Sequence, residues 1–166
     1  MICQCFLNVL NKEIDLDKTK NLKFGVIGVG RIGKIHIENL AHRIPGNEVT
    51  AIADVFEDEL QNVARQYNIS LAVQDYKEII ENPEIDAVVI CSPTDTHSQI
   101  IQQSAIAGKN VFCEKPVDLS LEKIAKTIKV TENAGVKFQV GFNRRFDPNF
   151  FQVYKIVIRL HLLWTI

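Results

Sequence analysis

Three glycines, Gly28, Gly30 and Gly33, stand in G-x-G-x-x-G spacing where an apolar segment gives way to a helical pattern. In such a loop the first glycine permits a tight turn, the second lets the backbone approach a diphosphate, and the third lets the helix press against the strand. The amide groups at the helix start then face the anion. Glycines also serve ordinary strand-to-helix turns, so this spacing alone indicates a dinucleotide site only weakly.

Asp54 strengthens that interpretation, because it ends the next apolar segment, 21 residues after Gly33. A carboxylate there accepts hydrogen bonds from an adenosine ribose diol and repels a 2′-phosphate, so we expect NAD rather than NADP. The stretch also fits the G-x-x-x-x-G-K loop of nucleotide triphosphatases, but Ile35 stands where a hydroxyl should bind magnesium. Arg31 either lies along the pyrophosphate or is a solvated side chain at a helix start.

Hydroxyl groups follow a later apolar segment, in the stretch CSPTDTH. Ser92, Thr94 and Thr96 each offer a hydroxyl to a ligand or to a helix start. In the structural interpretation, Thr94, Asp95 or Thr96 caps the following helix. Both roles can hold at once, because the helix start and the ligand edge coincide.

Histidines and a lysine are further candidate residues. Taken singly, His97 is more often a structural histidine, and Lys115 is more often an exposed lysine in a loop. His36 and His42 lie on the first predicted helix, and we expect them to be packing or surface residues.

The elements that position these residues alternate between short apolar segments and helical patterns. The predicted strands are 22–28, 49–54, 86–92, 110–114 and 137–142. Apolar residues recur at helical spacing in Leu60, Val63, Ala64 and Tyr67 and again in Leu121, Ile124, Ala125 and Ile128. This alternation predicts a doubly wound α/β fold of the Rossmann type with a parallel sheet. Every polar cluster follows a strand, so one edge of the sheet should collect them all.

Composition limits the possible partners. The chain has 166 residues, 46% of them hydrophobic, which is enough for one substantial core. The formal net charge is -1 and the basic residues are dispersed, so no basic face suits nucleic acid or an anionic membrane. The apolar run near the amino terminus is far shorter than the roughly 20 residues of a membrane span. We therefore expect a small-molecule ligand, no nucleic acid and no membrane.

The four cysteines give no sign of a disulfide framework. Cys91 and Cys113 lie inside apolar segments, where a free cysteine behaves as a small hydrophobic residue. Cys3 and Cys5 are spaced C-x-C, with no histidine pair at ligand spacing, so we expect no metal site. This cysteine usage predicts a reducing, cytoplasmic location.

Five motifs occur together and in order: GVIGVGRIGKIH, AIAD, ICSPTDTH, FCEKP and VGFNRRFDPNF. In this combination the chain resembles the amino-terminal half of the Gfo/Idh/MocA oxidoreductases, from about Leu22 to Phe150. The last two motifs most resemble the inositol 2-dehydrogenases of that family. The resemblance implies oxidation of a secondary hydroxyl of an inositol-like polyol, with hydride transfer to NAD.

The resemblance also implies roles for individual residues. Those that line the dinucleotide would be Gly28, Gly30, Arg31, Ile32, Gly33 and Asp54, followed toward the nicotinamide by Ser92, Pro93, Thr94, His97 and Glu114. Lys115 would be the catalytic lysine, close to nicotinamide and substrate hydroxyl, where a cation favours the developing alkoxide. Asn143 and Arg144 would contact the polyol.

In the family, the proton goes to a histidine with an aspartate four residues before it, both in a second α+β domain. His161 does not match, because Val157 stands four residues earlier. We therefore expect an amino-terminal extension (1–21), an NAD-binding domain (22–142) and a truncated or aberrant start of the substrate domain (143–166). Intact family enzymes would be homo-oligomers, whereas this chain alone is expected to be inactive.

Two alternatives stay open. In the first, the chain is a non-catalytic dinucleotide-binding or interaction module that pairs through the apolar segment 151–166, and in the second it is an unstable gene fragment. The first alternative predicts a defined oligomer that is lost on trimming. The second predicts that no cooperative thermal transition occurs.

Overall fold

The structure is a computed structural model that describes residues 21–163, apart from the side chains of Phe146 and residues 159–163. The predicted extension therefore lies outside the described residues except for Asn21. Cys3 and Cys5 also lie outside them, as does the side chain of His161.

Within residues 21–163, six parallel strands form one sheet in the order β3-β2-β1-β4-β5-β6. The strands are β1 (Leu22–Ile27), β2 (Asn47–Ala53), β3 (Leu71–Val73), β4 (Ala87–Ile90), β5 (Asn110–Cys113) and β6 (Phe138–Val140). The order reverses between β1 and β4, which confirms the predicted doubly wound α/β fold. The prediction missed β3, because three half-buried residues are too few to show a strand pattern.

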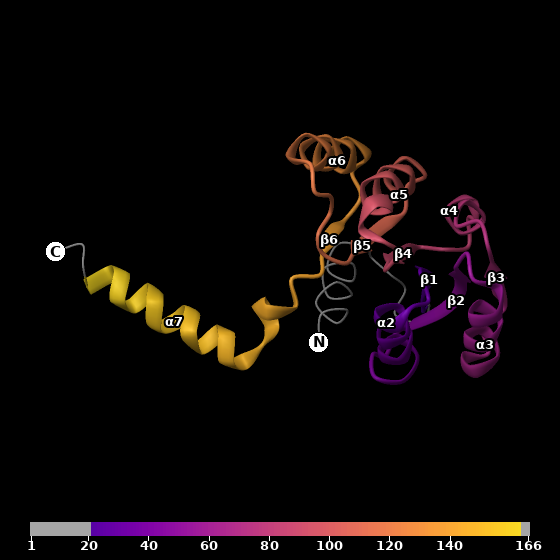
Figure 1. Cartoon of the computed structure of the whole chain (residues 1–166), viewed down its shortest axis with the longest axis horizontal. Coiled ribbons are helices and arrows are strands. Elements are labelled where there is room, and N and C mark those ends of the chain that lie inside the picture. Colours follow the sequence, from indigo (N-terminus) through magenta and orange to yellow (C-terminus); the bar gives the residue numbers. More distant parts are fainter. Residues whose placement is uncertain (1–20, 164–166) are drawn as a thin grey trace.

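Helices cover both faces of the sheet (Figure 1). One face carries α2 (Arg31–His42) and α3 (Glu57–Tyr67), and the other carries α4 (Lys77–Glu81), α5 (Thr94–Ile106) and α6 (Leu121–Ala134). The strands therefore contribute to a core on each side. Val26 packs with Leu40 on the first side, whereas Ile27 and Ile90 pack with Ile101 on the second. Burial on both faces explains why the strands are apolar nearly throughout.

The apolar stripe predicted for α3 is confirmed. Leu60, Val63 and Ala64 are buried and belong to the core on the side of α2. Leu60 and Val63, which are at most 1% exposed, each contribute roughly 1.5–3 kcal/mol of stabilisation. The stripe therefore fixes α3 against the sheet.

The helix α6 exists, but of the stripe predicted for it only Ile124 packs against the core. Leu121 is 83% exposed and Ile128 is 43% exposed, while Thr127 and Thr131 are buried instead. The threonine hydroxyls donate to the carbonyls of Lys123 and Ile128, each at 2.8 Å, so they are buried without losing a hydrogen bond. Helical spacing shows which residues share a face, but the neighbours of the helix decide which face is buried.

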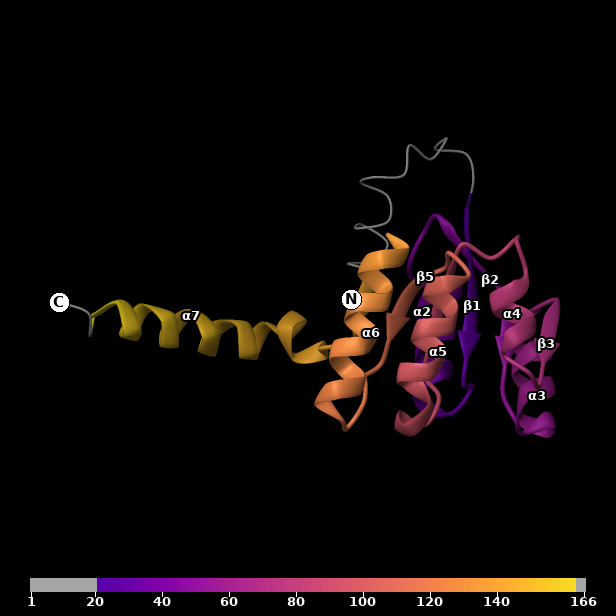
Figure 2. The ribbon, with the colours of Figure 1, turned by 90° about the horizontal axis from the view of Figure 1, so that it is seen from above.

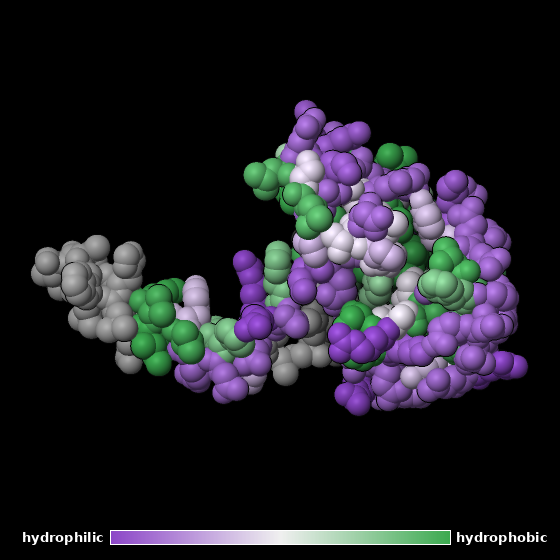
Figure 3. Space-filling model, viewed as in Figure 1, coloured by the Kyte–Doolittle hydropathy of each residue, from purple (hydrophilic) through white to green (hydrophobic). Residues whose placement is uncertain are grey.

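A short 3-10 helix, η1 (Asn143–Phe146), and α7 (Pro148–Leu163) follow β6. α7 projects away from the sheet as a single helix (Figures 1 and 2). Its described apolar side chains from Phe150 to Ile158 are 41–58% exposed, and Figure 3 shows hydrophobic residues on its surface. In the part of the chain that the structure describes, no helix has the length and hydrophobicity to cross a bilayer.

Candidate functional site

The carboxyl ends of four neighbouring strands meet at one edge of the sheet. Backbone hydrogen bonds continue past the strand ends there, joining Cys91 N to Ile27 O (2.7 Å), Glu114 N to Ile90 O (2.9 Å) and Gly141 N to Cys113 O (2.8 Å). The loops after β1, β4, β5 and β6 therefore lie side by side. The polar clusters gather at one edge, as the strand pattern predicts.

Two glycines of the G-x-G-x-x-G motif, Gly28 before α2 and Gly33 within it, are required by the fold itself. Gly28 has a φ of +93°, and a Cβ there would lie 2.7 Å from backbone atoms of Cys91 and Ser92. A Cβ at Gly33 would overlap the carbonyl oxygen of Gly28. Because the obstructing atoms belong to the backbone, neither position accepts a side chain without a shift of the loop.

Gly30 differs from its two neighbours in the motif. A Cβ there would meet no described atom within 4 Å. Gly30 is exposed and directly precedes α2, whose first residue, Arg31, is also exposed. The described fold does not require glycine at this position, whereas a diphosphate approaching the amides at the helix start would require it.

Asp54 directly follows β2, and its carboxylate is bonded to the glycine loop. Oδ2 accepts a hydrogen bond from Val29 N at 2.7 Å, and Oδ1 accepts one from Phe56 N at 3.1 Å. A carboxylate offers about four acceptor positions. The two bonds therefore orient the group and leave acceptor capacity for a ribose diol.

The hydroxyl cluster after β4 differs in part from the prediction. α5 begins at Thr94 with Pro93 at the N-cap position and no side-chain cap, so the expected cap by Thr94, Asp95 or Thr96 is wrong. The reason lies in the hydroxyl of Thr96, which donates to Pro93 O at 2.7 Å and lies 2.7 Å from Ser92 Oγ. Ser92 and Thr94 are half-buried at the edge.

His97 lies inside the protein, with only 2% of its surface exposed. Its Nδ1 is 2.7 Å from Pro116 O, and its Nε2 is 2.8 Å from Ser92 O. The Lys115–Pro116 peptide bond, which is cis, belongs to the same loop after β5. The ring therefore links the loops after β4 and β5 and does not present a free nitrogen at the edge.

Glu114 and Lys115 directly follow β5. Lys115 is exposed, and its backbone amide donates to Glu114 Oε2 at 3.3 Å. Glu114 Oε1 lies 2.9 Å from His36 Nε2. Burial by itself would raise the pKa of Glu114, but the hydrogen bond and charge of His36, together with Lys115, hold that pKa below the usual glutamate range. The edge therefore carries an ionised carboxylate next to the exposed lysine.

The predicted site left out His36, although its ring lies next to Glu114. His36 is buried, so of the two roles expected for it, packing or surface, it has the packing role. The helical spacing of Gly33, His36, Ile37 and Leu40 places it on the buried face of α2, and this signal is readable in the sequence. The spacing does not reveal that Glu114 is its partner.

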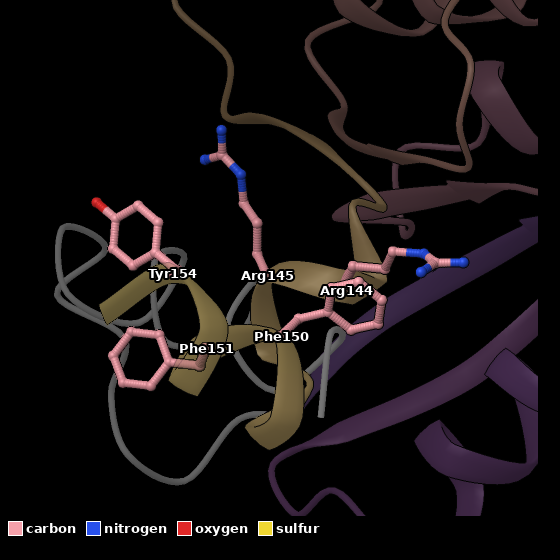
Figure 4. Close-up of a pocket in the computed structure, with 5 residues that line it drawn as sticks. All are labelled: Arg144, Arg145, Phe150, Phe151 and Tyr154. Carbon is pink, nitrogen blue, oxygen red and sulfur yellow. The ribbon is translucent and has the colours of Figure 1, made fainter. Parts of the chain in front are cut away.

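Asn143 and Arg144 lie in η1, just beyond β6, and both are exposed. The guanidinium carbon of Arg144 is 4.4 Å from the centroid of the Phe150 ring. A cavity of about 560 Å³ is lined by Arg144, Arg145, Phe150, Phe151 and Tyr154 (Figure 4). Arg144 thus packs along the first turns of α7, and its contact with a polyol stays a prediction.

A family profile described as an oxidoreductase family with an NAD-binding Rossmann fold matches residues 22–142, which contain the glycine loop, Asp54 and Lys115. The chain belongs to the Gfo/Idh/MocA oxidoreductase family. This match confirms the predicted family and the predicted cofactor, NAD. The contacts of individual residues with the dinucleotide stay predictions.

Several relatives in the Gfo/Idh/MocA family are inositol dehydrogenases. The chain is 43% identical to the inositol 2-dehydrogenase of Rhizobium meliloti over 139 residues, which cover 82% of this chain and 40% of that protein. It is 46% identical to the myo-inositol 2-dehydrogenase of Thermotoga maritima over 129 residues, which cover 78% of this chain and 38% of that protein. The chain thus spans about 40% of the length of the curated relatives it matches.

A solved structure of this family has the same fold. The scyllo-inositol dehydrogenase of Lactobacillus casei, with bound NAD(H) and scyllo-inositol, matches with a TM-score of 0.80 at 36% identity. The match covers 84% of this chain and 42% of that one.

The residues of this Gfo/Idh/MocA chain fit NAD on geometric grounds. Gly30 leaves open space at the start of α2, and the half-buried Asp54 carboxylate stands next to the same loop. Lys115 supplies an exposed cation at the far end of the same edge. Helix-start amides, a carboxylate and a cation thus lie after β1, β2 and β5 at one edge of the sheet.

Proposed function

We propose that residues 22–142 are the coenzyme-binding part of an NAD-dependent dehydrogenase acting on an inositol-like polyol. Residues 1–21 would then be an extension, and residues 143–166 would begin the substrate-binding part. The observation that carries the proposal is the bond from Val29 N to Asp54 Oδ2 next to the open position at Gly30. This hydrogen bond keeps Asp54 next to the glycine loop, which supports the binding of a ribose and a diphosphate by the same part of the chain.

Within this proposal each part of the edge has a chemical task. Bound NAD⁺ would supply the hydride acceptor. The amides at the start of α2 hold the diphosphate, with Arg31 and Ile32 beside it. Asp54 accepts hydrogen bonds from the ribose hydroxyls, and its negative charge repels a 2′-phosphate. These contacts fix the coenzyme along the edge before any chemistry occurs.

Lys115 would act on the substrate in this proposal. Its ammonium stabilises negative charge on the oxygen as the hydroxyl proton leaves, which lowers the barrier to hydride loss from carbon. Asn143 and Arg144 would orient the polyol by hydrogen bonds to its other hydroxyls. The names of the relatives support an inositol as the substrate class.

We further propose that this chain binds NADH without oxidising myo-inositol by itself. A proton acceptor has to receive the hydroxyl proton during oxidation. Among the described side chains, the edge holds His36 and His97, which are buried and hydrogen-bonded within the protein. It also holds Glu114, whose carboxylate is already hydrogen-bonded to His36 and to the Lys115 amide. Robust turnover of myo-inositol by the purified chain would contradict this part of the proposal.

The main test is a titration of the wild type and of Asp54→Ala with NADH and with NADPH. Loss of the carboxylate should raise the dissociation constant for NADH by about tenfold, the size of a lost charge-assisted hydrogen bond. Discrimination against NADPH should fall, because the repelling charge is gone. Asp58→Ala is the matched control, since Asp58 is an exposed acid in the next helix. Identical curves for wild type and Asp54→Ala would remove Asp54 from the site.

A second candidate function is pairing through α7. The observation that favours it is the exposure of 56–58% at Val153, Tyr154, Ile156 and Val157. Exposed apolar surface of this kind marks interaction sites or aggregation hazards. Light scattering before and after removal of residues 151–166 tests it, because a pairing module should lose a defined oligomer. An oligomeric state that is unchanged by the trimming would refute it.

A further inference from the structure

Two groups bind the carboxyl group of Glu114, and the backbone of a third segment lies close to it. His36 reaches Oε1 from α2 at 2.9 Å, and the Lys115 amide donates to Oε2 at 3.3 Å. The backbone of Gly141, after β6, lies so close that a Cβ there would be 3.2 Å from Glu114 Cδ and Oε1. With its side chain only 20% exposed, the carboxylate is fixed in place.

The bond between His36 and Glu114 joins the two ends of the candidate site. α2 begins directly after the glycine loop, and Glu114 directly precedes Lys115. An ionised carboxylate only accepts hydrogen bonds, so Nε2 of His36 is the donor. The imidazole is held in turn, because it is 5% exposed and its centroid lies 5.1 Å from that of the Phe112 ring in β5.

We propose that His36 is a positioning residue that acts through the Glu114 carboxylate to fix the backbone of Lys115 relative to the glycine loop. The helix α2 would then position both the glycine loop, which it directly follows, and Lys115, through the contact of His36 with Glu114. This inference depends on the proposed function in one respect only, because NADH is the ligand of one of the two measurements. The contacts themselves belong to the chain.

The test compares His36→Leu, His36→Gln and His42→Leu in the full chain. Leucine removes the donor, whereas glutamine retains an N–H group that can reach the position of Nε2. His42 lies on the same helix with its side chain 61% exposed, so it is the matched control.

The first readout is the amide ¹H–¹⁵N resonance of Lys115, followed in a pH titration without coenzyme. This amide donates to Glu114, so its shift reports the ionisation of that carboxylate. The charged groups that act on Glu114 are His36 from α2 and Lys115 from its own loop, and the Gly141 backbone adds no charge. The second readout is the NADH dissociation constant, measured by fluorescence.

In the His36→Leu chain, the Lys115 resonance should move and its pH midpoint should rise, because Glu114 loses the bond and the charge that favour its ionised form. The NADH dissociation constant should rise about tenfold. His36→Gln should restore the resonance and most of the affinity, and His42→Leu should change neither. An unchanged resonance and midpoint in His36→Leu would overturn the proposal, even if its melting temperature falls.

If His36→Leu does not fold, Glu114→Gln tests the same contacts from the other end. Glutamine keeps hydrogen-bonding groups but cannot ionise in this range, so the pH-dependent movement of the Lys115 resonance should vanish. Persistence of that movement would overturn the proposal. A wild-type chain that fails to bind NADH would count against the proposed function alone, since the Lys115 resonance is measured without coenzyme.

Discussion

Strand β4 and helix α7 are both apolar, yet they have opposite surroundings. Each residue of β4, from Ala87 to Ile90, is at most 1% exposed, whereas the described apolar side chains of α7 are 41–58% exposed. Sheet neighbours lie on both sides of β4, and helices cover both faces. Among the described elements, α7 packs mainly against η1. An apolar sequence favours burial, but whether a segment is buried depends on the elements that pack against it.

The largest effect should come from truncating a buried residue of β4 and an exposed residue of α7 in the same way. Ile90→Ala should lower the free energy of unfolding by about 4 kcal/mol, because it leaves a cavity in a closely packed core. Ile156→Ala should change it by less than about 0.5 kcal/mol, because its side chain is already largely hydrated. Urea denaturation of both variants measures the difference. Similar losses at the two positions would show that α7 is buried in solution.

Gly28 and Gly30 in the glycine loop also have opposite surroundings, since a Cβ would meet backbone atoms at Gly28 and open space at Gly30. Gly28→Ala should lower the free energy of unfolding by roughly 3 kcal/mol, from the left-handed backbone and the overlap with the next loop. Chemical denaturation followed by circular dichroism measures it. A neutral effect would mean that the loops after β1 and β4 are less closely packed than the structure has them.

A smaller and pH-dependent effect is expected at Glu114. Its pKa is lowered in the folded chain, so its stabilisation is complete above the unfolded value of about 4.3 and is lost as the pH falls toward the folded value. The stability difference between wild type and Glu114→Gln should therefore shrink as the pH falls below about 5. Denaturation at several pH values measures it, and a difference that grows toward low pH would have the wrong sign.

The smallest effect on stability should come from Gly30→Ala, within about 0.5 kcal/mol, because a Cβ there meets open space. Its NADH affinity should nevertheless fall by about tenfold or more, since the methyl group would lie where a diphosphate has to approach the backbone. Thermal unfolding and NADH titration of the same preparation separate the two effects. Unchanged NADH affinity would assign Gly30 no part in the coenzyme site.

Much of the coenzyme edge could be predicted, because its signals are local. The glycine spacing and Asp54 predict a dinucleotide fold, and the family match confirms it. The helix cap after β4 was predicted wrongly, because the Thr96 hydroxyl bonds to Pro93 O instead. The prediction for Glu114 was also incomplete. The resemblance placed this residue beside the coenzyme but did not indicate its contact with His36.

Except for the short strand β3, the sequence by itself determined the kinds of strand-forming and helical segments along the sheet and the family, since these depend on residues that are close in the chain. Only the tertiary structure decided that α6 buries its threonines and that His36 meets Glu114 across 78 residues of sequence. The physical reason is that hydrophobic periodicity acts within one element, whereas the buried face of a helix and the partner of a polar group depend on which strands are neighbours in the sheet.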